Sequence, residues 1–458
     1  MLSSSIAVAS LGTPRIGPRC ELKAALESFW AGRSDAAALQ ETAAALRAAN
    51  WARQHARGVT VIPSNDFSLY DHVLDLSVMV GAIPPAYGWS GGAVPLDVYF
   101  AMARGAEGAA DHDAACGHAH GAAAGHGAPA QEMTKWFDTN YHYMVPEFSA
   151  GQTFTLASTK PVDEYREARA LGYATRPVLL GPVTFLKLGK SKDAGFDPLM
   201  LLERLLPVYV EALRRLVAEG ADWVQFDEPC LVLDLDAAAH AALRQAYATF
   251  AREVPALKIM LTSYFGGLGD NRDVALALPV AGLHLDLVRA PDQLDEVLAK
   301  APRDLTLSLG VIDGRNVWRA DLPALRARLA PVIAARGAAR IQLAPSCSLL
   351  HVPVDLELET DLDADVKSWL SFAVQKMDEL VLLARAFGGE GAAIAAGLDA
   401  SGKAAAARRV SPKVHDAAVA ARLAAVTPAM ERRHSPFAAR GRVQHARFRL
   451  PAFPTTTI

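Results

Sequence analysis

The 458-residue sequence predicts an α/β fold, a (βα)8 TIM-type barrel with an N-terminal helical lead-in and a helical C-terminal linker. Three observations carry this prediction: eight short apolar runs, amphipathic patterns between several of them, and polar residues at the carboxyl end of nearly every run. Continuously apolar runs are typical of parallel strands that are buried on both faces. Polar side chains at the ends of such strands indicate the face on which barrel active sites are built.

The eight predicted strands are, in chain order, "VTVIPSND", "YHYMVPEF", "PVLLGPVTF", "DWVQFDEP", "KIMLTSYF", "GLHLDLV", "LTLSLGVID" and "RIQLAPSCS". Amphipathic patterns over 199–218 and 321–335 predict helices between them. The barrel is expected over 57–387, with a low-complexity insertion at 101–130. A helical lead-in over 1–56 and an Ala- and Arg-rich segment over 388–458 lie outside it. The opening "MLSSSIAVAS" lacks a basic region, so we expect no cleaved targeting peptide and organised structure from Leu11 onward.

Composition excludes several classes of protein. The net charge of −3 and the pI near 6.5 give no basic surface for nucleic acid. Asp, Gly and Pro interrupt the longest apolar stretches well short of the roughly 20 residues that a bilayer requires, so no membrane segment is expected. The cysteines are few and widely spaced, which predicts a reducing compartment, the cytoplasm. They are Cys20, Cys116, Cys230 and Cys347.

The stretch "LGTPRIGPRCELKAALESFW" predicts the start of a helix, with Pro18 in its first turn. The helix would carry an apolar stripe of Leu22, Leu26, Phe29 and Trp30.

Basic residues surround this helix start. Arg19 and Lys23 are four residues apart and would share a face, and Arg15 lies just upstream. Free N–H groups at a helix N-terminus attract anions, so the pattern predicts an anion site. The alternative is a solvated basic face that pairs with Glu21. Lys135, in the aromatic stretch "EMTKWFDTNYHYMVPEF", is a second predicted anion contact, although such aromatic density is also typical of a core.

Two sets of residues have metal-ligand chemistry. The insertion holds Asp111, His112, Asp113, Cys116, His118, His120 and His126, but Ala and Gly provide no scaffold there, and a surface loop is favoured. The predicted strand ends hold Asp227, Glu228, Cys230, His284, Asp286, Cys347 and His351. The sequence does not establish that these side chains converge, so no metal ligand is assigned in this chain.

Several long segments, in order, resemble cobalamin-independent methionine synthase. They are "LGTPRIGPRCELKAALESFWAG", "DFSLYDHVLD", "EMTKWFDTNYHYMVPEF", "VLLGPVTFLKLGK", "WVQFDEPCLVLDL", "GRNVWRADL", "SCSLLHVPVDLELET" and "LPAFPTTTI". That family has two face-to-face (βα)8 barrels, so the resemblance implies that this chain is the first barrel and the interdomain linker. The ending "PTTTI" would then be the entry strand of the second barrel, where Ile458 matches the first residue of a homocysteine-contacting turn.

The resemblance implies methyl transfer from 5-methyltetrahydrofolate polyglutamate to homocysteine, without cobalamin. It places zinc, which holds homocysteine as a thiolate, on ligands in the second barrel. This chain would then be inactive alone, with Asp227, His284 and Cys347 as relics of an equivalent mouth.

The resemblance also implies that the folate and its tail contact Cys20, Glu21, Leu22, Lys23 and Lys135. Most members of the family carry Arg where this chain has Cys20. Arg15, Arg19 or Lys23 would compensate for that change.

Two other functions stay open at this point. One is a stand-alone folate-polyglutamate binding protein without catalysis. The other is an autonomous barrel enzyme that uses the Cys, His and Asp residues at the strand ends. Zinc content would distinguish the second from the rest.

Overall fold

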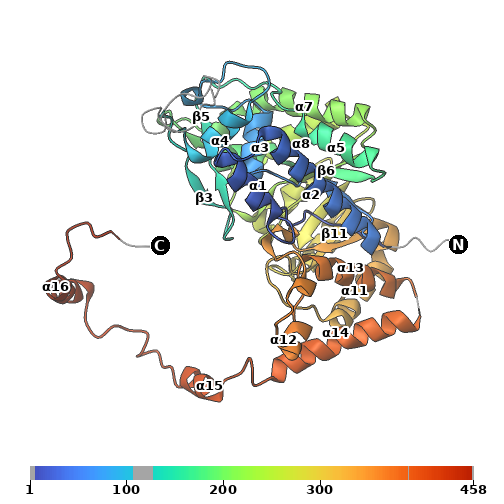
Figure 1. Ribbon diagram of the computed structural model, residues 1–458. Helices are drawn as coiled ribbons and strands as arrows, with labels where there is room; N and C mark the ends of the chain where they lie inside the picture. Colours follow the sequence, from blue (N-terminus) through green and yellow to red (C-terminus); the bar gives the residue numbers. More distant parts are fainter. Residues whose placement is uncertain (1–5, 107–126, 390, 456–458) are drawn as a thin grey trace. The chain divides into compact units, whose positions relative to one another are not determined.

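The computed structural model describes residues 6–106, 127–389 and 391–455. The chain forms two compact units, Met1–Ala405 and Ala406–Ile458, and the boundary falls inside helix α14 (Ala392–Val410). The first unit is a barrel with its surrounding helices (Figure 1). Among the described residues of the insertion, Ala101 to Arg104 end a helix, and its metal-ligand candidates lie outside the described residues.

Eight parallel strands form the barrel, in the order β1-β12-β11-β10-β9-β8-β6-β2. They are β1 (Ala7–Val8), β2 (Ile62–Ser64), β6 (Thr175–Leu180), β8 (Trp223–Asp227), β9 (Lys258–Thr262), β10 (Gly282–Asp286), β11 (Thr306–Ile312) and β12 (Ile341–Pro345). The outermost strands of this order, β1 and β2, are joined by a parallel bridge between Ala9 and Val61. The backbone N–H of Ser10 also donates to the carbonyl of Val61 at 3.0 Å, so the sheet closes on itself. The predicted TIM-type barrel is confirmed.

One of the eight predicted strands is wrong. The run "YHYMVPEF" forms β4 (His142–Met144), which pairs antiparallel with β3 (Met133–Lys135), and β5 (Glu147–Phe148), which pairs with β7 (Lys190–Ser191). The missing barrel strand is β1, which lies ahead of the point where organised structure was expected. Two residues are too few to produce an apolar run, and β1 is defined by its pairing with β12 instead.

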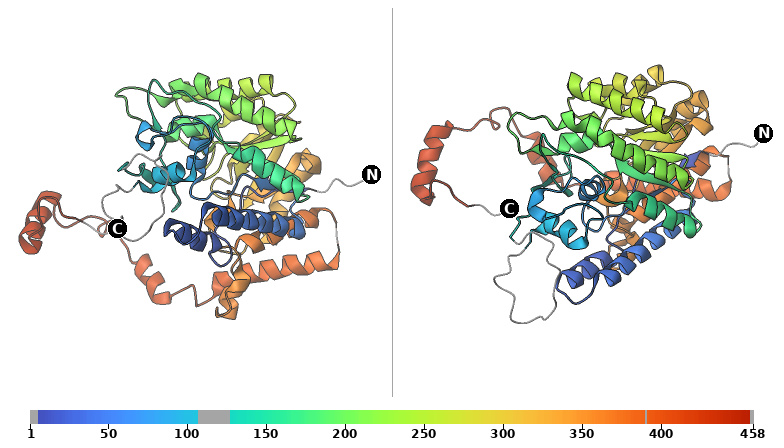
Figure 2. Two further views of the ribbon diagram at one scale, coloured as in Figure 1. Left: turned by 45° about the horizontal axis from the view of Figure 1, so that its top comes forward. Right: turned by 90° about the horizontal axis from the view of Figure 1, so that it is seen from above.

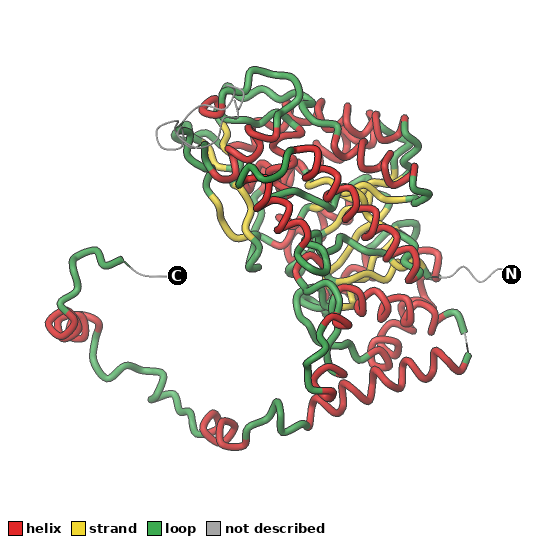
Figure 3. The backbone as a smooth tube through the Cα atoms, in the orientation of Figure 1, coloured by secondary structure: helices red, strands yellow, loops and turns green. Residues whose placement is uncertain are grey.

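Helices cover the outside of the strands (Figure 3). In the first unit they are α1 (Glu21–Trp30), α2 (Ala36–Arg57), α3 (His72–Met79), α4 (Leu96–Arg104), α5 (Lys160–Ala170), α6 (Pro182–Leu188), α7 (Leu202–Ala218), α8 (Ala237–Glu253), α9 (Arg272–Ala277), α10 (Gln293–Lys300), α11 (Leu322–Arg336), α12 (Ala364–Ser368), α13 (Ala373–Phe387) and α14. The helices predicted at 199–218 and 321–335 correspond to α7 and α11.

The lead-in helices α1 and α2 pack against each other beside the barrel, where Figure 2 shows them in blue. Leu22 and Leu26 of α1 are buried in a second apolar cluster with residues of α2, α3 and α4. The predicted apolar stripe is therefore confirmed. The start of the helix is not where Pro18 placed it, because α1 begins at Glu21 after Cys20 adopts a left-handed backbone with φ of 61°.

The second unit contains the end of α14, α15 (Ala417–Ala424) and α16 (Phe437–Phe448). Neither α15 nor α16 has a buried residue. Residues 451–455 have no strand structure, although a strand was expected to begin in "PTTTI". Ile458, the predicted homocysteine contact, lies outside the described residues.

Candidate functional site

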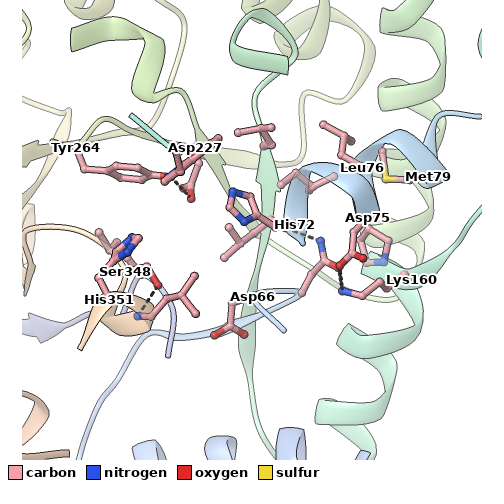
Figure 4. A pocket seen from close by; sticks show the side chains of 18 residues that line it. Asp66, His72, Asp75, Leu76, Met79, Lys160, Asp227, Tyr264, Ser348 and His351 are labelled. Atoms are coloured by element: carbon pink, nitrogen blue, oxygen red, sulfur yellow. Dashed lines mark hydrogen bonds and ion pairs between the residues drawn. The ribbon is translucent and has the colours of Figure 1, made fainter. Parts of the chain in front are cut away.

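A small cavity of about 70 Å³, the mouth cavity, lies at the carboxyl ends of the barrel strands (Figure 4). Its polar lining comes from the loop after β2, from α3, α5 and β8, and from the segments after β9 and β12. These polar residues are Asn65, Asp66, His72, Asp75, Lys160, Asp227, Tyr264, Ser348 and His351. Strand-end polar residues predicted from the sequence therefore do gather at one face of the barrel.

Asp227 is the mouth residue whose pKa lies near neutral pH. Burial raises its pKa to about 7, although hydrogen bonds from Gln225 and Tyr264 act in the opposite direction. Gln225 Nε2 donates to Asp227 Oδ1 at 2.8 Å, and the Tyr264 hydroxyl donates to Oδ2 at 3.0 Å. The carboxyl can therefore hold or release a proton near pH 7.

The two histidines of the mouth are neutral. The His72 ring lies edge-on to Trp136, with centroids 4.5 Å apart, and is stacked on Tyr141 at 5.4 Å. Burial and the charge of Arg15 lower the pKa of His72 to about 3. Burial and the charge of neighbouring groups lower the pKa of His351 to about 4. The mouth thus offers uncharged imidazoles beside a carboxyl group, a combination suited to a small polar molecule.

Lys160 closes the other side of the mouth but is fully engaged. Its Nζ donates to Asn65 Oδ1 at 2.8 Å and to the Phe67 carbonyl at 2.6 Å. It also forms ion pairs with Glu164 at 3.1 Å and Asp75 at 3.4 Å. Figure 4 shows the Asp75–Lys160 pair on the opposite side of His72 from Asp227. This lysine therefore fixes the loop after β2 rather than offering a free charge.

The remaining strand-end candidates are bound into the barrel. Both carboxylate oxygens of Glu228 accept hydrogen bonds from the start of α6, at 2.7 Å from Thr184 N and 3.3 Å from Val183 N. His284 contacts Ser308 Oγ at 2.9 Å and the Ser346 carbonyl at 3.2 Å.

Three candidates are left in this set. Asp286 accepts three backbone N–H bonds, from Phe265, Val288 and Arg289. Cys230 and Cys347 are buried thiols whose pKa burial raises. Within the described ranges, no three His, Cys, Asp or Glu side chains lie together as metal ligands would.

A larger cavity of about 680 Å³, the α1 groove, lies between the start of α1 and the segment 350–359. Four of the predicted folate contacts line it together: Arg15, Cys20, Leu22 and Lys23. Its lining also includes the carboxylates Glu27, Asp355 and Glu359 and the aromatic residues Trp30, Tyr70 and Tyr141. The groove is therefore apolar along its walls and carries charges of both signs.

Arg15 is the buried charge of the groove, with 8% of its surface exposed. Its Nη2 donates to the Tyr70 carbonyl at 3.0 Å and to the Tyr141 hydroxyl. Its Nη1 is buried and has no hydrogen-bond partner within the described ranges. Sequence analysis placed Arg15 only upstream of the helix and did not predict its burial.

Lys23 is exposed, by contrast, and its Nζ lies 3.8 Å from Glu27 Oε1 of the next turn. The remaining predicted contacts do not line the groove. Glu21 accepts a hydrogen bond from the Arg19 backbone N–H at 3.0 Å, so this carboxylate is engaged by the turn that precedes the helix. Arg19 precedes the helix and shares no helical face with Lys23, contrary to prediction. Lys135 is exposed on β3.

Sequence reasoning missed Asp71, whose carboxylate joins several parts of this region. Its Oδ2 accepts hydrogen bonds from Leu74 N at 2.9 Å and Met144 N at 3.1 Å, and its Oδ1 accepts one from the Tyr141 hydroxyl at 2.9 Å. An Asp directly before a helical pattern is a typical N-cap, and "YDHVLD" contains that signal. The link to Tyr141, seventy residues away, has no local signal.

Comparison with known proteins gives a family match. The family described as "Cobalamin-independent synthase, N-terminal domain" matches residues 7–336. Two curated relatives are named 5-methyltetrahydropteroyltriglutamate–homocysteine methyltransferase. The relative from Rhodopseudomonas palustris is 70% identical over 458 residues, which is 100% of this chain and 58% of that protein. The relative from Nitrobacter winogradskyi is 69% identical over 452 residues, which is 98% of this chain and 58% of that protein. The chain therefore spans about 58% of the length of these relatives.

Two solved structures share the fold. A putative vitamin-B12 independent methionine synthase from Listeria monocytogenes aligns with a TM-score of 0.54 and 14% identity, over 85% of this chain and 100% of that one. A B12-independent methionine synthase from Shewanella sp. W3-18-1 aligns with a TM-score of 0.52 and 12% identity, over 84% and 97%. Among the described residues, no helix is long and apolar enough to cross a bilayer. The family match and the curated relatives establish that the chain belongs to the cobalamin-independent methionine synthase family, matching its N-terminal domain.

Proposed function

We propose that this chain is the N-terminal half of an enzyme that transfers a methyl group from 5-methyltetrahydrofolate polyglutamate to homocysteine, forming methionine. The names and identities of the curated relatives support this reaction. The chain's own contribution would be to bind the anionic tail of the folate. The observation that carries this assignment is the α1 groove, in which a buried guanidinium, Arg15, lies beside Cys20 and Lys23.

The charges of the groove are compatible with an anionic tail. Glu27 is paired with Lys23, and Asp355 Oδ1 accepts hydrogen bonds from Gln375 Nε2 at 2.7 Å and Glu357 N at 3.1 Å. Arg15 is the cation that is withdrawn from water, and a charge-assisted hydrogen bond to it would contribute about 1.5–3 kcal/mol. Lys23 and Lys135 are exposed, so each would contribute less.

The rest of the active site is proposed to lie outside this chain. The described residues do not offer a zinc site, because the strand-end His, Cys and Asp side chains are bound to other partners. We propose that zinc, which would supply a homocysteine thiolate, is held by a C-terminal barrel in the part of the relatives' length that this chain does not match, and that this chain is inactive alone. The cytoplasmic location predicted from cysteine usage is part of the proposal, and the three described cysteines are free thiols.

The tail-binding role can be tested by comparing two ligands that differ only in tail length. Lys23→Ala and Lys135→Ala should each weaken pteroyl-triglutamate binding to this chain about fivefold and pteroyl-monoglutamate binding less than twofold. Titration calorimetry at low ionic strength measures both affinities. Lys300→Ala is the matched control, since Lys300 is an exposed lysine paired with Asp273 on the barrel helices. Equal losses for both ligands would remove the tail-binding role.

A stand-alone folate-polyglutamate binding protein is the second candidate, because every proposed tail contact belongs to this chain. The mass of the endogenous polypeptide distinguishes the two functions. An antibody raised against residues 60–90 should detect a product near twice 48.7 kDa if the chain is part of the two-barrel enzyme. A product near 48.7 kDa would favour the binding protein instead.

A further inference from the structure

We infer that Tyr141 and Asp71 are positioning residues that hold the Arg15 guanidinium so that one of its nitrogens is left for a carboxylate of a ligand in the α1 groove. This inference rests on the proposed function and adds to it two residues from outside the helix start. The groove itself is formed mainly by other segments, so neither residue is indicated by its position in the sequence.

The first step is the hydrogen bonding of Arg15. Its two hydrogen bonds, to the Tyr70 carbonyl and the Tyr141 hydroxyl, are both donated by Nη2. Nη1 is buried without a partner in the described part of the chain. A buried cationic donor without an acceptor is costly, and native proteins seldom keep one unless a ligand, water or ion completes it. An anionic ligand would supply that acceptor.

The second step is the direction of the hydrogen bonds. The Tyr141 hydroxyl has one proton, which it donates to Asp71 Oδ1 at 2.9 Å. Its oxygen therefore accepts from Arg15, and the order Arg15 to Tyr141 to Asp71 is fixed. Burial raises the pKa of Tyr141, so the phenol keeps its proton. Burial raises the pKa of Asp71 to about 6, so this acceptor is mainly ionised at neutral pH.

The third step is the rigidity of Asp71. Its second oxygen is held by Leu74 N at the start of α3 and by Met144 N of β4. The carboxylate therefore joins α3 to the β3–β4 hairpin, and Tyr141 transmits that fixed position to Arg15. A guanidinium held on one edge can present the other edge without losing further side-chain entropy when it binds.

The ligand chemistry follows from this geometry. A planar guanidinium whose Nη1 has no partner among the described residues pairs best with a carboxylate. An oligo-γ-glutamate presents one carboxylate on every residue, so tri-γ-glutamate alone is a sufficient probe. We expect this peptide to bind the 458-residue chain without any folate attached.

The test is a double-mutant cycle measured by titration calorimetry with tri-γ-glutamate. Tyr141→Phe should weaken binding about tenfold, and Arg15→Lys should weaken it at least as much. Because Tyr141 acts through Arg15, adding Tyr141→Phe to Arg15→Lys should cause less than a twofold further loss. Tyr143→Phe is the matched control. Tyr143 is two positions after Tyr141 in the sequence, and its hydroxyl donates to the Leu188 carbonyl at 3.1 Å. Asp71→Asn, expected to weaken binding about fivefold, keeps the test valid if Tyr141→Phe does not fold.

The outcomes separate this inference from the proposed function. If the unaltered chain does not bind tri-γ-glutamate, the tail-binding function and the inference both fail. If the chain binds it and Tyr141→Phe binds equally well, only the inference fails. A full tenfold loss in both backgrounds would also overturn it, because Tyr141 would then act independently of Arg15.

Discussion

The mouth cavity and the α1 groove use their polar residues in opposite ways. In and below the mouth, Asp227, Glu228 and Lys160 are all engaged by neighbouring groups of the barrel. In the groove, Arg15 has a buried nitrogen without a partner among the residues that the structure describes, and Lys23 is exposed. Polar residues at strand ends therefore identify the barrel, whereas the proposed tail-binding site lies on the lead-in and the hairpin. Substitutions at the mouth should change stability, and those in the groove should change affinity.

The largest effect is expected for Glu228→Ala. The substitution would leave the buried N–H of Thr184 and the Thr184 hydroxyl, 2.6 Å from Glu228 Oε2, without their acceptor. We expect the free energy of unfolding to fall by about 3–5 kcal/mol. Urea denaturation measures this loss, and Glu27→Ala on α1 is an exposed control. A loss below 1 kcal/mol would contradict the structural role of the mouth.

The acid stability of the barrel should depend on His284, which is fully buried. Burial lowers its pKa to about 3, whereas an unfolded histidine titrates near 6.5. The unfolded chain therefore binds this proton first, and stability falls as the pH drops below 6.5, by about 1.4 kcal/mol per pH unit. His284→Gln should remove that slope between pH 6.5 and 4 in urea titrations. An unchanged slope would mean that other groups control acid unfolding.

Asp227 should show the opposite dependence on pH. Its pKa of about 7 lies above the unfolded value of 3.8, so the folded chain holds the proton more tightly. Stability is then highest below pH 4 and decreases as the pH rises through 7. We therefore compare the free energy of unfolding of Asp227→Asn with that of the unaltered chain at pH 4 and at pH 8. Because this carboxyl is only part-buried, we expect the difference to shift in favour of Asp227→Asn by about 2 kcal/mol from pH 4 to pH 8. Melting curves at both pH values test this, and tail affinity should not change.

The smallest effect on stability is expected in the groove, at Cys20. Its left-handed φ of 61° is strained for any residue with a Cβ. Cys20→Gly should therefore raise the free energy of unfolding by about 1 kcal/mol. Cys20→Arg should leave stability within about 0.5 kcal/mol while tightening triglutamate binding about threefold, because it adds a cation to the groove. For Cys20→Arg, a change in the free energy of unfolding larger than the change in the free energy of binding would remove the distinction between the two regions.

The sequence predicted the barrel well because buried parallel strands must be apolar along their length. Seven of the eight predicted runs contain barrel strands, and the exception, "YHYMVPEF", pairs outside the barrel with β3 and β7. The strand β1 escaped prediction because its two residues are held by pairing with β12 and not by their own pattern.

The candidate site was only partly predictable. The basic cluster at 15–23 was visible as charge around a helix start, and Arg15, Cys20, Leu22 and Lys23 do line one groove. Charge patterns do not report burial, so the sequence could not show that Arg15 is buried and that Lys135 is exposed. The contact from Asp71 to Tyr141 joins residues seventy positions apart, and only the folded chain brings them together.

The pairing of β1 with β12 also constrains how this protein is made. Ala7 and Val8 reach their partners only when Gln342 and Leu343 have been synthesised, so the first strand emerges from the ribosome long before its place in the barrel exists. The lead-in that carries Arg15 and Cys20 follows β1 directly, and segment 350–359 forms the facing wall of the groove. The groove can therefore form only after segment 350–359 has been synthesised. Until β12 has been synthesised, β1 is an unpaired strand that could associate with other chains.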